Sequence, residues 1–115
     1  MPELSTLEKM KKIFHVMDDV SRLKILHVLF DDCGCTCNHE CSSCECLHCK
    51  RERSVSEIVS LTGLEQSLVS HQLKVLKDVD LISSRREGTK MIYFLADGHV
   101  RSILKTVYEH VMEEE

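Results

Sequence analysis

The run Gln66-Ser-Leu-Val-Ser-His-Gln-Leu-Lys-Val-Leu76 decides the fold of this chain. Val69, Leu73 and Leu76 repeat at the i, i+4, i+7 spacing of one helix face, so the run predicts an amphipathic helix from about Gln66 to Val79. The other side of this helix is polar and carries Ser67, Ser70, His71, Lys74 and Lys77. One face is therefore expected to pack inward while the opposite face stays available for a partner.

The segments on either side of this helix predict a winged helix-turn-helix. Upstream, Ser56 can cap a short helix over residues 57–62, and Gly63 then makes the turn. Downstream, two β-prone runs at 81–86 and 90–95 flank a turn at 87–89, which indicates a hairpin. This hairpin would form the wing beside the recognition helix.

Three further helices complete the predicted architecture. Ser5-x-x-Glu8 indicates a capping box that opens a helix with one apolar face, ending near Met17. Ser21 can cap a second helix, apolar on most of its surface and expected at the centre of the core, and the last helix should run from about Gly98 to Met112. We expect a single domain over residues 1–115, mainly α with a small β-hairpin, that forms a homodimer through its first and last helices.

Composition limits the function of the chain. Its 115 residues carry a formal net charge of −4, which argues against a polycation-like nucleic-acid binder but not against a sequence-specific one, since only the contact face need be basic. The polar start lacks the apolar run of a signal peptide, and no stretch is long and apolar enough for a membrane span. We therefore expect a cytoplasmic protein with no membrane partner.

Operator DNA is the partner that the recognition helix and wing predict. Short hydroxyl side chains let a helix sit deep in the major groove, and the N-terminal part of the helix reads the bases. Basic residues on the hairpin would hold the flanking phosphates. The candidate DNA-binding residues are Gln66, Ser67, Ser70, His71, Lys74, Arg85, Arg86 and Lys90. The alternative is a solvated helix face beside a charged edge hairpin.

The last helix carries candidate metal ligands at both ends. Asp97-x-His99 lies at its start and His110-x-x-Glu113 at its end. Eleven residues return to nearly the same face but separate the two histidines by roughly 16 Å, so one chain cannot close a zinc site. Two antiparallel copies can, because Asp97 and His99 of one would meet His110 and Glu113 of the other. The alternative is two surface histidines beside an acidic tail.

All seven cysteines fall within an insert at about residues 31–53, which has almost no other apolar residues. They are Cys33, Cys35, Cys37, Cys41, Cys44, Cys46 and Cys49. An odd number of cysteines in a protein expected in the cytoplasm argues against a disulfide framework, and the spacing suits soft-metal ligation, with His39 or His48 as further donors. A second metal site, a loop with adventitious metal affinity and a thiol redox sensor all remain open.

The sequence resembles the ArsR/SmtB family of metal-sensing winged-helix repressors. Asp19-Val-Ser-Arg-Leu-Lys-Ile-Leu26, the run from Gln66 to Leu76 and Arg85-Arg-Glu-Gly-Thr-Lys-Met-Ile-Tyr93 resemble the family's second helix, recognition helix and wing. Asp97-x-His99 and His110-x-x-Glu113 resemble the zinc-sensing site of one branch. The chain departs from a sister branch, which carries a Cys-x-Cys pair where Ser54 and Ser56 stand.

This resemblance implies a homodimer that binds its operator when metal-free and releases it when a metal ion is bound, with zinc as the expected ion and cadmium or another soft metal as the alternative. A metal-storage protein or a thiol redox sensor built on the cysteine insert is the alternative function. An enzyme is not expected, because the sequence has no Ser-His-Asp arrangement, phosphate-binding loop or His-Glu-x-x-His motif.

Overall fold

The computed structural model describes residues 1–30 and 52–113. In chain order the elements are α1 (Leu4–Met17), α2 (Val20–Phe30), β1 (Arg53–Ser54), α3 (Val55–Thr62), α4 (Gln66–Asp78), β2 (Ile82–Glu87), β3 (Lys90–Leu95) and α5 (Gly98–Glu113). The seven cysteines, His39 and His48 of the predicted insert lie outside the described residues. The description resumes at Glu52, and Arg53 already belongs to a strand.

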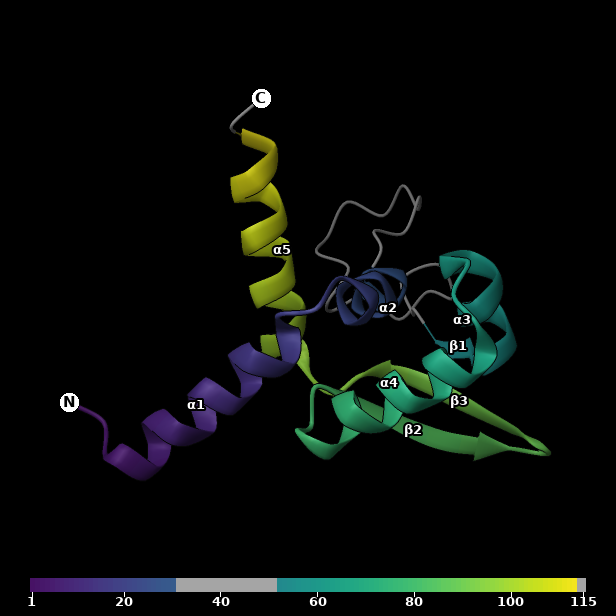
Figure 1. The fold of residues 1–115 in the computed structure, drawn as a ribbon, viewed down its shortest axis with the longest axis horizontal. Coiled ribbons are helices and arrows are strands. Elements are labelled where there is room, and N and C mark those ends of the chain that lie inside the picture. The colour runs from purple at the N-terminus through teal and green to yellow at the C-terminus, as the bar shows by residue number, and fades with distance from the viewer. Residues whose placement is uncertain (31–51, 114–115) are drawn as a thin grey trace.

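The architecture is the predicted one, a mainly helical winged helix-turn-helix with a small antiparallel sheet. In Figure 1 the β2–β3 hairpin extends from the body beside α4, while α1 and α5 project from the body in different directions. The sheet has three strands in the order β1-β3-β2, so sequence analysis missed β1. This strand pairs Arg53 with Tyr93 and Ser54 with Ile92. Two residues are too short for a periodic signal, and only pairing with β3 makes them a strand.

The core forms where α2, α3 and α4 meet the base of the wing. Ile25, Leu26 and Leu29 of α2 are fully or almost fully buried, as predicted for the central helix. Val69, Leu73 and Leu76 of α4 are equally buried, which confirms the inward face read from the sequence. Ile58 of α3 and Ile82 of β2 complete the fully buried set. The recognition helix is therefore held on one side by close apolar packing.

All three helix caps predicted from the sequence differ from the caps in the structure. The residue that precedes α1 is Glu3, whose side chain makes no capping hydrogen bond, so the capping box from Ser5 to Glu8 does not form. The helix starts at Leu4, one residue before the predicted cap. Ser21 lies within α2, and Asp19 takes the capping role because its Oδ2 accepts from the Arg22 backbone N–H at 3.0 Å.

The third cap is also displaced, from Ser56 to Ser54. The Ser54 hydroxyl accepts from the Glu57 backbone N–H at 3.3 Å, and the Glu57 carboxylate accepts from the Ser54 N–H at 2.9 Å. That backbone hydrogen bond lowers the pKa of Glu57. This reciprocal box ends β1 and starts α3 without a linker, and Gly63 closes α3 in the left-handed region at φ 74°.

We predict that Ser54→Ala lowers the free energy of unfolding by about 1 kcal/mol, because an N-terminal donor of α3 loses its acceptor. Ser60→Ala is the matched control, since Ser60 is exposed and lies further along the same helix. Urea unfolding of the two variants measures the difference. Equal losses for both would contradict the assignment of the cap to Ser54.

Candidate nucleic-acid interface and metal-binding helix

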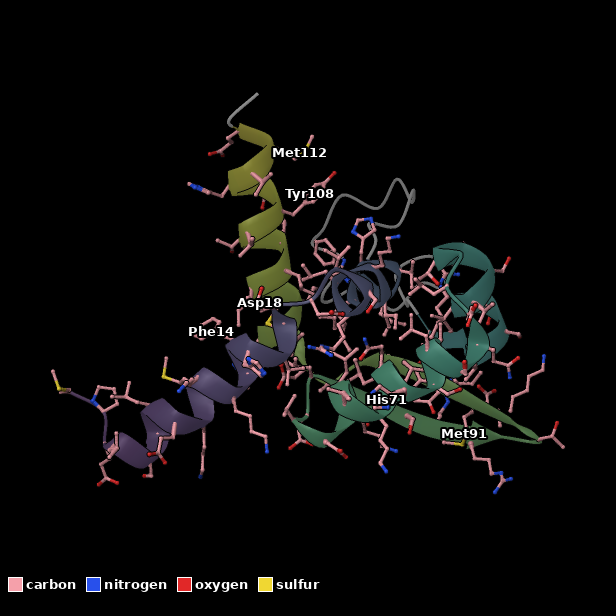
Figure 2. All side chains as sticks on the ribbon, in the orientation of Figure 1. Phe14, Asp18, His71, Met91, Tyr108 and Met112 are labelled. Atoms are coloured by element: carbon pink, nitrogen blue, oxygen red, sulfur yellow. The ribbon has the colours of Figure 1, made fainter. Side chains whose placement is uncertain are left out.

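The predicted DNA-reading residues of α4 share one exposed face. Gln66, Ser67, Ser70, His71 and Lys74 are all exposed, and Figure 2 labels His71 on this helix. Their side lies opposite Val69, Leu73 and Leu76, so the burial of α4 presents the polar face to solvent. Lys77 continues that side but donates from Nζ to Ser84 Oγ of β2 at 2.6 Å, which ties the helix to the wing.

The three wing cations differ in their surroundings. Arg85, Arg86 and Lys90 are all exposed. Arg85 donates to both carboxylate oxygens of Glu52, at 2.5 and 2.9 Å, and to Glu87 at 2.9 Å. Its guanidinium carbon also lies 5.7 Å from the centroid of the Phe94 ring. The hydrogen bonds that Arg85 donates, above all those to Glu52, raise the pKa of Arg85 further above its usual value.

Two carboxylates on one guanidinium leave this part of the wing without a net positive charge. A phosphate near Arg85 would have to compete with Glu52 and Glu87 for the same donors. Among the described residues, Glu52 and Glu87 form their ion pairs with Arg85 and not with Arg86 or Lys90. Sequence analysis assigned all three cations the same role, because Glu52 is 33 residues from Arg85 in the chain.

We predict that Arg86→Ala and Lys90→Ala each weaken DNA binding and reduce the slope of log Kd against log salt by about one, as expected for the loss of a phosphate contact. Arg85→Ala should change that slope less, since its charge is already neutralised within the wing. Salt titrations of a labelled fragment from the DNA upstream of the gene measure the slopes. A full unit lost in Arg85→Ala would show that Glu52 releases this arginine on DNA.

The start of α5 holds two of the four predicted metal ligands side by side. Asp97 Oδ1 accepts from the backbone N–H groups of His99 and Val100, at 2.9 and 3.1 Å, and so caps the helix. These hydrogen bonds, the one from Val100 first, lower the pKa of Asp97. His99 Nδ1 lies 3.6 Å from the same oxygen, and the His99 side chain is 95% exposed. Two of the predicted metal ligands, Asp97 and His99, therefore already lie next to each other at the surface.

His110 and Glu113 lie at the other end of the same helix. Within residues 1–30 and 52–113 of one protomer, no three His, Cys, Asp or Glu side chains converge on a common point that could hold a metal ion. The two predicted ligand pairs therefore lie at opposite ends of α5.

A groove joins the start of α5 to the end of α4. It has a volume of about 450 Å³ and is lined by Lys9, Lys12 and Ile13 of α1, by Asp78 at the end of α4 and residues 79–81 after it, and by Asp97, His99, Val100 and Ile103. Asp80, in this lining, has a φ of 58°, which is uncommon for a residue other than glycine. Sequence analysis did not place the lysines of α1 here, because no sequence pattern links residues so far apart.

Two helices expose apolar side chains that the described protomer leaves uncovered. On α1 they are Leu4, Leu7, Met10 and Phe14, and on α5 they are Ile103, Val107, Tyr108, Val111 and Met112. Figure 2 shows Phe14 on α1 and Tyr108 and Met112 on α5, away from the wing. Large exposed apolar patches often mark sites of protein association, so these helix faces are suited to a protein partner. Among the described helices, none is long and apolar enough to cross a membrane.

The winged helix and its exposed recognition face define a DNA-binding transcriptional regulator. Residues 46–84 match the profile described as bacterial regulatory protein, arsR family. The chain is 30% identical over 102 residues to an uncharacterized HTH-type transcriptional regulator, MJ1325, of Methanocaldococcus jannaschii, an alignment that covers 89% of this chain and 94% of that one. This chain belongs to the ArsR family of transcriptional regulators, a family of regulators and not of enzymes.

Two further similarities agree with this assignment. The chain is 27% identical over 117 residues to a protein of Synechocystis called transcriptional repressor SmtB homolog, with 99% of this chain and 74% of that one covered. A solution structure of Mb0332 from Mycobacterium bovis, described as a homodimeric winged helix-turn-helix DNA-binding domain, superposes with a TM-score of 0.74 over 96% of this chain and 84% of that one. Its sequence identity of 24% supports the fold alone.

Proposed function

We propose that this chain is a metal-responsive repressor that binds operator DNA when metal-free and releases it when zinc, or another divalent or soft metal ion, is bound at α5. The observation that carries the proposal is the pairing of Asp97 with His99 at the exposed start of α5, in a groove shared with the end of the recognition helix. The Synechocystis relative is named a transcriptional repressor, which supports repression rather than activation as the role proposed for this chain.

The donor chemistry of α5 fits zinc. One carboxylate and one imidazole from each end of the helix make a set of oxygen and nitrogen ligands, which suits a four-coordinate zinc ion. An aspartate carboxylate is ionised at neutral pH, as metal ligation requires. Asp97 and His99 would share the ion with the partner's His110 and the partner's Glu113. Zinc would supply a fixed bridge between the two chains.

A homodimer would cover the apolar faces of α1 and α5. Antiparallel pairing of α5 across a two-fold axis brings each Asp97–His99 pair to the opposite helix end and generates two identical sites. Mb0332, which shares this fold, is described as homodimeric, and that description is consistent with a dimer of this chain. Metal binding and dimer geometry would then be linked.

The groove between α5 and α4 offers a path from this site to the DNA. Asp78, the last residue of the recognition helix, and residues 79–81 after it line the same groove as Asp97 and His99. A change in the packing of α5 therefore reaches the end of α4 without an intermediate element. A coupling free energy of about 1–3 kcal/mol would change operator affinity by roughly 5- to 150-fold.

The cysteine insert stays a candidate second metal site. Its role is best tested by the metal content of the purified protein, wild type against a variant with all seven cysteines replaced by serine. Loss of only part of the bound metal would separate the insert from the α5 site, and complete loss would favour metal storage by the insert.

We predict that His99→Ala binds the upstream DNA as wild type does in the presence of EDTA, yet keeps that affinity in excess zinc. Wild type should lose affinity about tenfold or more under the same conditions, because only its α5 site can close. Fluorescence anisotropy titrations with and without zinc measure both states. Equal zinc responses of the two proteins would rule out the α5 site as the sensor.

The two roles of Asp97 can be separated by substitution. Asp97→Ala should lose both the metal ligand and the cap of α5, and its Tm should fall by about 4 °C. Asp97→Ser should keep the cap, because a serine hydroxyl also accepts from the first turn, and its Tm should stay near that of wild type. Both variants should lose the zinc response. A zinc response retained by Asp97→Ser would remove Asp97 from the ligand set.

A further inference from the structure

Gln72 stands out as a polar residue on the buried face of the recognition helix. It is only 6% exposed and lies between His71, on the DNA-reading face, and Leu73, in the core. A buried amide is costly unless its donors and acceptor are paired. Sequence analysis took this face as apolar, and nothing in the proposed metal response uses the residue.

Every polar atom of the Gln72 side chain has a partner at the junction between α1 and α2. Its Oε1 accepts from Arg22 Nη1 at 3.0 Å. Its Nε2 donates to Ser21 Oγ at 2.7 Å and lies 3.3 Å from Asp19 Oδ2. We call these four residues, Asp19, Ser21, Arg22 and Gln72, the junction network.

The junction network also holds the end of α1. Arg22 Nε donates to the backbone carbonyl of Val16, the buried residue in the last turn of that helix. Asp19 accepts from the Ser21 hydroxyl and from the Arg22 backbone N–H, so it fixes the start of α2. The hydrogen bond from Ser21 is the main reason that the pKa of Asp19 is lowered. One side chain of α4 is thus tied to the helices on both sides of the junction.

Hydrogen bonds restrain α4 in a way that its apolar contacts cannot. The packing of Val69, Leu73 and Leu76 holds the helix against the core, but burial of apolar surface is not directional. Arg22 Nη1 donates to the oxygen of the Gln72 amide and Ser21 Oγ accepts from its nitrogen, so these two bonds fit only one orientation of the amide. Because Ser70, His71 and Lys74 lie within two residues of Gln72, a rotation of α4 that breaks these bonds also turns the DNA-reading face.

We propose that Arg22 and Gln72 are positioning residues for operator recognition, which set the rotation of the recognition helix relative to the α1–α2 junction. They touch no DNA themselves. Their effect falls on base readout, which depends on the alignment of α4 in the major groove, more than on contacts to phosphates, which tolerate small shifts. The proposal concerns metal-free protein, so it does not depend on the α5 site.

The test compares specific with nonspecific binding in the presence of EDTA. Gln72→Met keeps the length and burial of the side chain but removes its hydrogen bonds. We expect this variant to bind the upstream DNA fragment about tenfold more weakly, the equivalent of one lost base contact, while its affinity for an unrelated fragment of equal length stays within about twofold of wild type. Val69→Ala is the matched control, because it removes buried apolar contact from the same face and should lower Tm without changing the ratio of the two affinities.

A second variant guards against misfolding of the first. Arg22→Lys keeps the charge but cannot bridge the Val16 carbonyl and Gln72 at once, so the specificity ratio should fall as in Gln72→Met. In the double variant the two losses should be smaller than their sum, since both remove the same network. An unchanged ratio in both single variants, a parallel loss on both DNA fragments, or fully additive effects would overturn the proposal.

Discussion

Burial of one face of α4 against α2 is the constraint on which the rest of the structure depends. Val69, Leu73 and Leu76 share a core with Ile25, Leu26 and Leu29, and this contact decides which side of α4 faces solvent. The wing follows directly from it, because Leu81 and Ile82 are buried in the same core and start the hairpin there. The candidate DNA-reading surface is therefore the face of α4 that is not packed against the core.

Charge on this surface is distributed unevenly. The chain is acidic overall, with a net charge of −4, so its attraction for DNA must come from local groups. Arg85 is neutralised by Glu52 and Glu87, which leaves Arg86 and Lys90 as the wing cations outside that cluster. Such an arrangement favours a regulator whose binding depends on the fit of the recognition helix, since the electrostatic attraction common to all DNA is small.

The exposed apolar side chains of α1 and α5 bear on the proposed dimer and its metal response. Both α1 and α5 leave apolar side chains exposed, and α5 also bears the two proposed ligand pairs, at opposite ends of the helix. A second copy would satisfy both features at once. The groove beside residues 78–81 and the junction network then connect α5 and α1, respectively, to the recognition helix. Residues 78–81 lie at the C-terminal end of α4 and Gln72 lies near its middle, so α4 is connected to the proposed sensing helix and to α1 at two separate points.

The sequence by itself determined the helices, the wing hairpin and the inward face of α4, because local periodicity and turn residues specify them. It also determined that the α5 ligands cannot meet within one chain, since helix geometry alone sets their separation. Only the tertiary structure decided that Ser54 and Asp19 cap their helices, that Arg85 is held by Glu52, and that Gln72 binds Arg22. The last two contacts join residues 33 and 50 positions apart, and no local pattern encodes which distant polar groups the packed core brings together.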